Sequence, residues 1–260
     1  MGLRPPAVAG LFYPDDPKEL RRTVEAFLAR VKPEGEAPKA AVVPHAGFIY
    51  SGPIAASVYA RLAPLKGRIK RLVLIGPAHR MAIRGLAAPS VEAFESPLGR
   101  IALDREAIAR IAKLPQVKID DAPHRLEHCL EVQLPFIIAC LGQVLLVPLL
   151  AGEADAREVA DVIELLWDGP ETLVLISSDL SHYHDYGTAR RMDAATSEAI
   201  EALDETRIGW DDACGRIPIS GLLQVARKRG LKARTVDLRN SGDTAGSKHE
   251  VVGYGGYVFN

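Results

Sequence analysis

The sequence predicts an α/β fold in which a mostly parallel or mixed central sheet carries helices on both faces. Short apolar runs rich in β-branched residues alternate along the chain with helical patterns of roughly 10–15 residues. The middle runs are apolar at almost every position, which is typical of strands that are buried on both faces. Because no internal repeat, low-complexity tract or Ser/Gly linker divides the chain, we expect one domain over residues 1–260.

The elements follow from the period and the flanking residues of each segment. The expected strands are Ala40–Pro44, Arg71–Gly76, Val144–Leu150, Thr172–Ser177 and Val251–Phe259. The first expected helix has Asp16 as its cap and Pro17 in its first turn, and it ends near Val31. The other expected helices are Gly52–Leu62, Asp104–Lys113, Leu126–Cys140, Asp155–Trp167, Ala189–Leu203 and Ile217–Arg229.

Composition excludes several classes of protein. The 260 residues are 48% hydrophobic and 25% charged, as in an ordinary globular protein. With 32 Lys and Arg against 33 Asp and Glu, there is no basic field to hold a nucleic acid or a membrane surface, and we expect neither partner. Apolar runs stay far below the ~20 residues of a membrane span. Three cysteines are too few for a disulfide framework, and the N-terminal residues lack a signal-peptide core, so we expect a cytoplasmic location.

Histidines follow three of the expected strands. His45 comes directly after Ala40–Pro44, His79 comes shortly after Arg71–Gly76, and His182 follows the strand that ends at Ser177. Ligands of open α/β sheets bind outside the carboxyl ends of the strands, so these histidines are expected to converge. Neutral imidazole is a common metal ligand and the usual base near pH 7. The alternative for each histidine is a capping or turn residue.

A second group of polar residues lies at the start of the expected helix Leu126–Cys140. On a helix His128 and Glu131 would share one face, as would Glu127 and Glu131. This spacing predicts an imidazole and carboxylates side by side, and the alternative is a solvated helix start at which acids favour the helix dipole. The order of residues is not His-Glu-x-x-His, which excludes a zincin.

Cys214 lies just before the expected helix Ile217–Arg229, next to Arg216. A thiol in that position is expected to have a lowered pKa, which would make it a better nucleophile or soft-metal ligand. The alternative is that Cys214 is a small buried apolar residue. Cys129 and Cys140 lie in an apolar segment and are expected to be small buried residues.

Taken together, these motifs resemble the Memo family, whose prokaryotic members are called AmmeMemoRadiSam system protein B. The resemblance spans nearly the whole chain, with the motifs in the family's order: Ala9–Pro14, Pro44–Gly52, Gly76–His79, Glu127–Pro135, Ser177–His182, Cys214–Ile219 and Gly253–Gly256. It implies the fold of LigB-type class III extradiol dioxygenases, whose non-haem iron lies at the carboxyl ends of the strands.

The resemblance also implies a metal site. Two histidines and a cysteine occupy the metal position in Memo proteins, and the matching residues here are His45, His79 and Cys214. His182 corresponds to the general base of the dioxygenases, and His128 and Asp179 line the same cavity. Because a thiolate replaces the carboxylate of the dioxygenase triad, iron or copper is implied in preference to zinc, and dioxygenase activity does not carry over.

The implied function is metal-dependent redox activity on an unknown substrate, with an AMMECR1-like protein and a radical SAM enzyme as partners. An alternative is a non-catalytic module whose cavity binds a small molecule, a peptide or a partner protein, with Arg80, Arg84 and Arg216 holding anionic groups. A further alternative is a zinc metallohydrolase, because zinc suits two imidazoles and one thiolate with an open position.

Overall fold

The computed structural model describes residues 2–260 and shows a mixed sheet with helices on both faces. In the described residues the main sheet has nine strands. Their order is β10 (His182–His184), β12 (Val251–Phe259), β2 (Ala40–Val43), β9 (Thr172–Ser177), β3 (Arg71–Pro77), β8 (Leu145–Ala151), β4 (Leu86–Ala88) and β7 (Val117–Ile119), with β11 (Ala233–Asn240) paired to β12. The predicted α/β class is confirmed, and every expected strand is present.

The middle of this sheet is parallel. Strand β2 pairs with β9, β9 with β3, and β3 with β8, all in the same direction. Nearly every residue of these strands is buried, which explains why their sequences are continuously apolar. The carboxyl ends of β2, β9 and β3 therefore lie next to one another at a single edge of the sheet.

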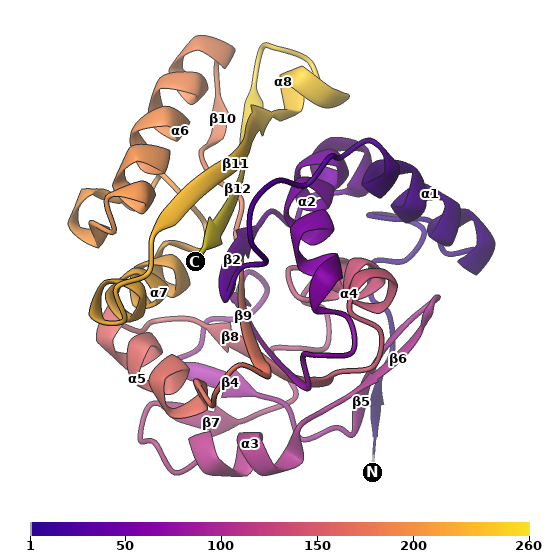
Figure 1. Ribbon diagram of the computed structural model, residues 1–260, viewed down its shortest axis with the longest axis vertical. Coiled ribbons are helices and arrows are strands. Elements are labelled where there is room, and N and C mark those ends of the chain that lie inside the picture. The colour runs from indigo at the N-terminus through magenta and orange to yellow at the C-terminus, as the bar shows by residue number, and fades with distance from the viewer. Residues whose placement is uncertain (1) are drawn as a thin grey trace.

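Two helical layers cover the sheet (Figure 1). One layer holds α1 (Pro17–Ala29), α2 (Phe48–Leu62) and α4 (Leu134–Cys140). The other holds α5 (Ala156–Leu166), α6 (Tyr186–Glu201) and α7 (Arg216–Lys228), with α3 (Arg105–Ile111) packed against α5. A four-residue helix, α8 (Ser241–Thr244), precedes β12. None of the helices in the described residues is long and apolar enough to cross a membrane.

Helix starts follow the capping residues. The Asp16 side chain accepts a hydrogen bond from Glu19 N at 2.8 Å, and Pro17 occupies the first turn of α1. Asp155 and Glu158 form a reciprocal capping box at the start of α5. These two starts are confirmed as predicted.

The expected helix Leu126–Cys140 is wrong in its first half. Residues 126–130 are irregular, a 3-10 turn covers Glu131–Gln133, and α4 begins only at Leu134. Pro135 fits the first turn of a helix, where its missing N–H leaves no bond unmade. Because residues 127–130 are not helical, the shared face predicted for His128 and Glu131 does not exist.

Glu131 instead holds the N-terminal segment. Its carboxylate pairs with the buried Arg4 guanidinium and accepts hydrogen bonds from Ala7 N at 2.8 Å, Val8 N at 2.9 Å and the Tyr13 hydroxyl at 2.6 Å. Arg4 lies in β1 (Leu3–Arg4), which forms a small sheet with β5 (Ala93–Ser96) and β6 (Gly99–Ala102).

Candidate metal centre

The chain places its candidate ligands at the shared carboxyl edge of β2, β9 and β3. His45 follows β2 by two residues, His79 follows β3 by two residues, and Asp179 follows β9 by two residues. Cys214 approaches the same edge from the turn before α7. The predicted convergence of strand-end residues is therefore what the structure shows for His45 and His79.

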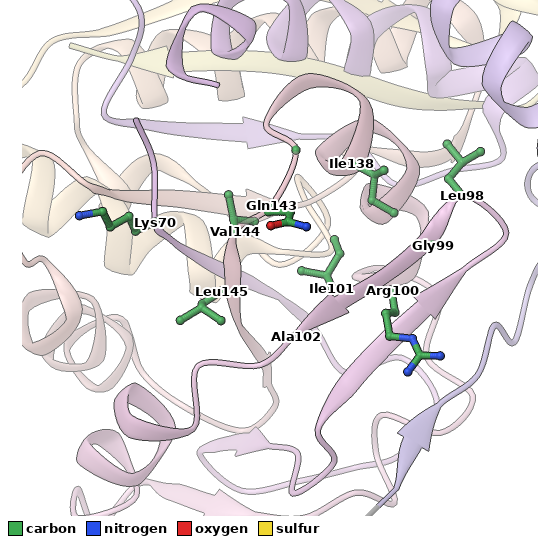
Figure 2. A pocket seen from close by; sticks show the side chains of 11 residues that line it. Lys70, Leu98, Gly99, Arg100, Ile101, Ala102, Ile138, Gln143, Val144 and Leu145 are labelled. Carbon is green, nitrogen blue, oxygen red and sulfur yellow. The ribbon is translucent and has the colours of Figure 1, made fainter. Parts of the chain in front are cut away.

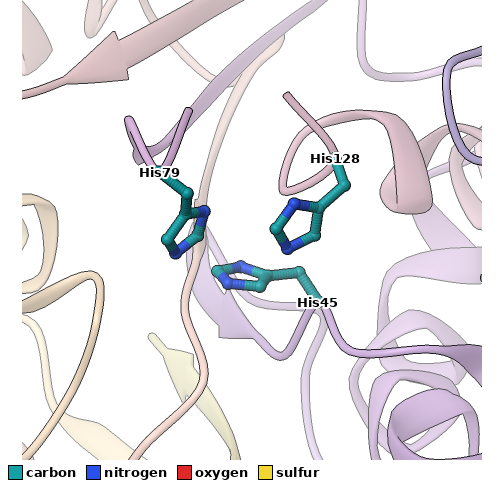
Figure 3. A group of neighbouring side chains, drawn as sticks. All are labelled: His45, His79 and His128. Carbon is teal, nitrogen blue, oxygen red and sulfur yellow. The ribbon is translucent and has the colours of Figure 1, made fainter. Parts of the chain in front are cut away.

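Three imidazoles form the centre of this group (Figure 3). One donor atom from each of His45, His79 and His128 lies within 4.8 Å of the other two. The His79 and His128 rings are nearly parallel with centroids 4.9 Å apart, and the His45 ring stands edge-on to both, at 5.2 Å and 5.5 Å. His128 comes from the irregular segment before α4, and it lies beside the two proposed histidine ligands, as the family resemblance implies.

Hydrogen bonding fixes the tautomer of His45. Its Nδ1 lies 3.0 Å from Ser177 Oγ. The Ser177 hydroxyl donates its one proton to Cys129 O at 2.6 Å and accepts from Gln133 Nε2 at 2.9 Å. Because that proton is already used, Ser177 can only accept from His45, so Nδ1 carries the hydrogen and Nε2 presents its lone pair to the site.

Glu127 fixes the tautomer of His79 in the same way. Its buried carboxylate lies 2.9 Å from His79 Nδ1 and accepts the backbone N–H of His79 at 2.6 Å. A carboxylate is a pure acceptor, so His79 Nδ1 carries the hydrogen and Nε2 is free to bind an ion. Burial opposes ionisation of Glu127, but the hydrogen bond and the charge of His79, together with backbone N–H donors, lower its pKa to about 2. The sequence does not predict that Glu127 orients His79. The one sequence signal for Glu127 is its position next to His128.

Burial keeps His45 and His128 neutral. Desolvation and the neighbouring His79 lower the pKa of His45 to about 3. Desolvation and His45 lower the pKa of His128 to about 4. Neutral imidazole is the form that binds metal ions.

Cys214 contacts the group of imidazoles at His45. Its Sγ lies 3.3 Å from His45 Nε2, accepts the N–H of Asp179 at 3.3 Å, and lies 3.9 Å from Ser178 Oγ. The expected lowering of the thiol pKa is wrong, because burial and the charge of Asp179 raise the pKa of Cys214 to about 12. The neighbouring Arg216 does not offset this effect. The Arg216 guanidinium stacks on Trp210 at 3.7 Å from the ring centroid.

Asp179 and His182 lie around this core. Buried Asp179 accepts the N–H of His45 at 2.7 Å, and burial raises the pKa of its carboxyl. His182 opens β10 and is half-buried, and it lies close enough that its charge would lower the pKa of His45. The next residue, Tyr183, has φ of 60° at an irregularity in the β10–β12 pairing, which turns this short strand beside the site.

The donor set fits a transition metal. His45 and His79 present Nε2, and Cys214 Sγ lies 3.3 Å from His45 Nε2, a combination that suits iron, copper or zinc. Among the described residues the three donors that lie within 4.8 Å of one another are those of His45, His79 and His128, and Cys214 stands beside this group next to His45. His128 Nδ1 is buried without a hydrogen bond, although it lies 3.2 Å from Glu127 Oε1. A buried polar atom without a hydrogen bond is rare, and here the Glu127 carboxylate faces it at that distance.

A cavity of about 390 Å³ opens beside Cys214. Its walls are mainly apolar and include Met81, Ile83 and Ile217. Trp210, which is 78% exposed, also lines it. Of the arginines proposed for anionic groups, Arg84 lines this cavity and pairs with Glu153 at the surface.

Comparison with known proteins places the whole chain in one family. A family profile described as Memo-like protein matches residues 4–258. A MEMO1 family protein of Aquifex aeolicus is 34% identical over 270 residues, with 100% of both chains covered. A MEMO1 family protein of Ignicoccus hospitalis is 36% identical over 286 residues, covering 100% of this chain and 99% of the relative.

One solved structure shows a similar fold. It is the crystal structure of an uncharacterized protein from Escherichia coli K12, with a TM-score of 0.55 at 13% sequence identity, covering 84% of this chain and 98% of that chain. At this identity the likeness concerns the fold alone. With a family profile and full-length relatives both matching, the chain belongs to the Memo family.

Proposed function

We propose that this protein binds one redox-active transition-metal ion, iron or copper, through His45, His79 and Cys214, and that it carries out a metal-dependent redox reaction on a substrate not yet known. One observation supports the proposal above all others. His45 donates its Nδ1 hydrogen to Ser177, and His79 donates its Nδ1 hydrogen to Glu127. The Nε2 atom of each ring is therefore available to bind an ion, and Cys214 Sγ lies 3.3 Å from His45 Nε2.

The bound ion would supply open coordination positions and exchange electrons with the substrate. The protein's own residues have separate tasks. Glu127 and Ser177 orient the imidazoles, and Asp179 holds the backbone of His45. His182 is proposed to hold or release a proton near His45 and Asp179, because its ring has no hydrogen bond within the described chain and is half-buried.

Iron and copper are preferred to zinc in this proposal because they can exchange electrons with a substrate, which zinc cannot, although a thiolate ligand suits all three ions. We also propose that the protein acts in the cytoplasm with an AMMECR1-like protein and a radical SAM enzyme, as the AmmeMemoRadiSam name implies. The three cysteines are free thiols, which fits a reducing compartment.

Metal analysis of protein purified without oxygen tests the site. We expect one iron or copper ion per chain, and loss of nearly all of it in His79→Ala and Cys214→Ala. Arg22→Ala, on the exposed face of α1, is the matched control and should keep its metal. Equal metal content in all four proteins would contradict the proposal.

Cys214→Ser separates the two metals. A hydroxyl is a poor ligand for soft ions, so we expect copper(I) affinity to fall much further than iron(II) affinity. Competition titrations with a chromophoric chelator for each ion measure both changes. Parallel losses for the two ions would show that sulfur does not select the metal.

A second candidate function is a non-catalytic module that binds a peptide or partner in the same cavity. The apolar walls beside exposed Trp210 favour it. Pull-down of the AMMECR1-like or radical SAM partner by a variant lacking all three proposed ligands would support this function. Dependence of that binding on the metal would favour the redox site.

A further inference from the structure

A second cavity, which shares no lining residue with the metal centre or the cavity beside it, lies between β6 and the start of β8 (Figure 2). Its volume is about 690 Å³. Ile101, Ile138 and Val144 form an apolar floor, and Lys70 and Arg100 stand at opposite ends of the opening. Nothing in the proposed redox function uses this cavity.

The cavity exists because two strands diverge. The β6 chain meets β8 at a single bridge between Leu103 and Leu146, where Asp104 N donates to Leu146 O at 2.8 Å. Toward Gly99 the two segments separate, and β5 is the one strand partner that β6 has within the described residues. One edge of β6 therefore faces the cavity.

The backbone of Arg100 points into that open edge. In the antiparallel β5–β6 pair, Leu103 N donates to Glu92 O at 2.8 Å, so Leu103 turns its backbone toward β5. Backbone direction alternates along such a strand, so Arg100, three residues earlier, turns its N–H and C=O away from β5. Such an edge is a template for pairing with another chain.

The side chains around this edge are of two kinds, apolar on the floor of the cavity and basic at its opening. Arg100 and Ile101 are adjacent in the strand and point to opposite faces, Ile101 to the apolar floor and Arg100 to the exposed side. Arg100 forms no ion pair in the described part of the chain, although Glu95 lies opposite it in register. Lys70 pairs with Glu171 at 2.6 Å, but both side chains are more than half exposed, so the pair is weak.

We infer that this cavity docks an extended segment of a partner protein in which acidic and apolar residues alternate. The segment adds a strand to the free edge of β6 through the backbone of Arg100. Its apolar side chains enter the floor formed by Ile101, Ile138 and Val144, and its acidic side chains face Arg100 and Lys70. Because side chains alternate between the two faces of a strand, one extended segment can place apolar residues on the floor and acidic residues toward Arg100 and Lys70.

The test uses a fluorescein-labelled peptide of eight residues that repeats Glu-Val, titrated with the full chain and followed by fluorescence anisotropy. We expect saturable binding, weakened in Arg100→Ala and Lys70→Glu and unchanged in the control Arg21→Glu, on the exposed face of α1. Arg100→Pro is the decisive variant. It should bind about tenfold more weakly than Arg100→Ala, because it also removes the outward N–H while sparing every bond to β5. Circular dichroism and thermal unfolding verify that each variant is folded.

Any one of four results would overturn the inference. Arg100→Pro could bind as well as Arg100→Ala, a Lys-Val peptide could bind as tightly, or a peptide methylated at alternate backbone nitrogens could bind equally. Failure of the Glu-Val peptide to bind also overturns it. In that case binding of decanoate would assign the cavity to an amphiphile, and a dimer dissociated by Arg100→Glu would assign it to a second copy of the chain.

Discussion

Single acceptor groups decide which nitrogen each imidazole presents to the metal centre. Ser177 accepts from His45 Nδ1, and Glu127 accepts from His79 Nδ1. The histidines and Cys214 could be predicted from the sequence, because they follow strands or precede a helix at one sheet edge. The roles of Glu127 and Ser177 could not, because they depend on tertiary contacts between segments far apart in the chain.

Glu127→Gln tests the orienting role at the scale of one residue. The amide keeps the volume but loses the charge and one acceptor atom, so His79 is held less firmly. We expect metal affinity to fall about 10- to 100-fold with the fold intact. Chelator competition on apo protein measures this, with exposed Glu153→Gln as the matched control. Unchanged affinity would show that Glu127 does not orient a ligand.

At the scale of elements, the metal centre depends on how closely α7 approaches the end of β9. Gly215 precedes α7, and a Cβ there would lie 2.5 Å from Ser178 Cβ and 3.1 Å from Ser177 O. Strand ends were predictable because continuous apolar runs mark buried parallel strands. The start of α4 was not, because the carboxylates of Glu127 and Glu131 bind distant segments instead of capping a helix.

Gly215→Ala should push α7 away from β9 and carry Cys214 with it. We expect a loss of about 1–3 kcal/mol in the free energy of unfolding, together with reduced metal occupancy. Denaturant titration and metal analysis measure the two effects. Gly2→Ala is the control, because its nearest neighbour lies at an ordinary 3.7 Å. Full occupancy in Gly215→Ala would mean that this contact does not position the thiol.

The buried ion pair between Arg4 and Glu131 joins the N-terminal segment to the turn before α4. Arg4→Met would leave the Glu131 carboxylate buried without its cation. We expect the free energy of unfolding to drop by about 3–5 kcal/mol. Urea titration of Arg4→Met and of the double variant Arg4→Met/Glu131→Gln checks this, and the double variant should recover part of the loss. A single variant as stable as the parent would contradict it.

For the whole molecule, the fold class and the central parallel strands follow from the sequence, but the half-buried strand β11 and the shortest strands do not. Strand β11 is half-buried and carries charged residues along its length, so no apolar run marks it. Strands β1 and β4 have two and three residues, too few to show a period. Buried titratable groups outside the metal centre also tie the stability of the entire fold to pH.

His124 provides the clearest test of that dependence. Its Nε2 lies 3.0 Å from Ala87 O, and burial lowers its pKa to about 4. The folded pKa lies below the unfolded value of about 6.5, so stability is full above pH 6.5 and falls as the pH drops toward 4. His124→Gln keeps the donor and removes the titration. We expect it to remove roughly 3 kcal/mol of that acid-induced loss.

Thermal or urea unfolding of apo protein between pH 7 and pH 4 measures the difference, with exposed His249→Gln as the control. Parallel pH curves for the parent protein and His124→Gln would mean that His124 is not held neutral by the fold.

The most direct test of the metal centre is a crystal structure of anaerobically prepared protein loaded with iron(II) or copper(I), with data collected on both sides of the metal absorption edge. We predict one anomalous peak within bonding distance of His45 Nε2, His79 Nε2 and Cys214 Sγ. A peak bound by the three imidazoles without the sulfur, or no peak at this sheet edge in a fully loaded protein, would contradict the assignment.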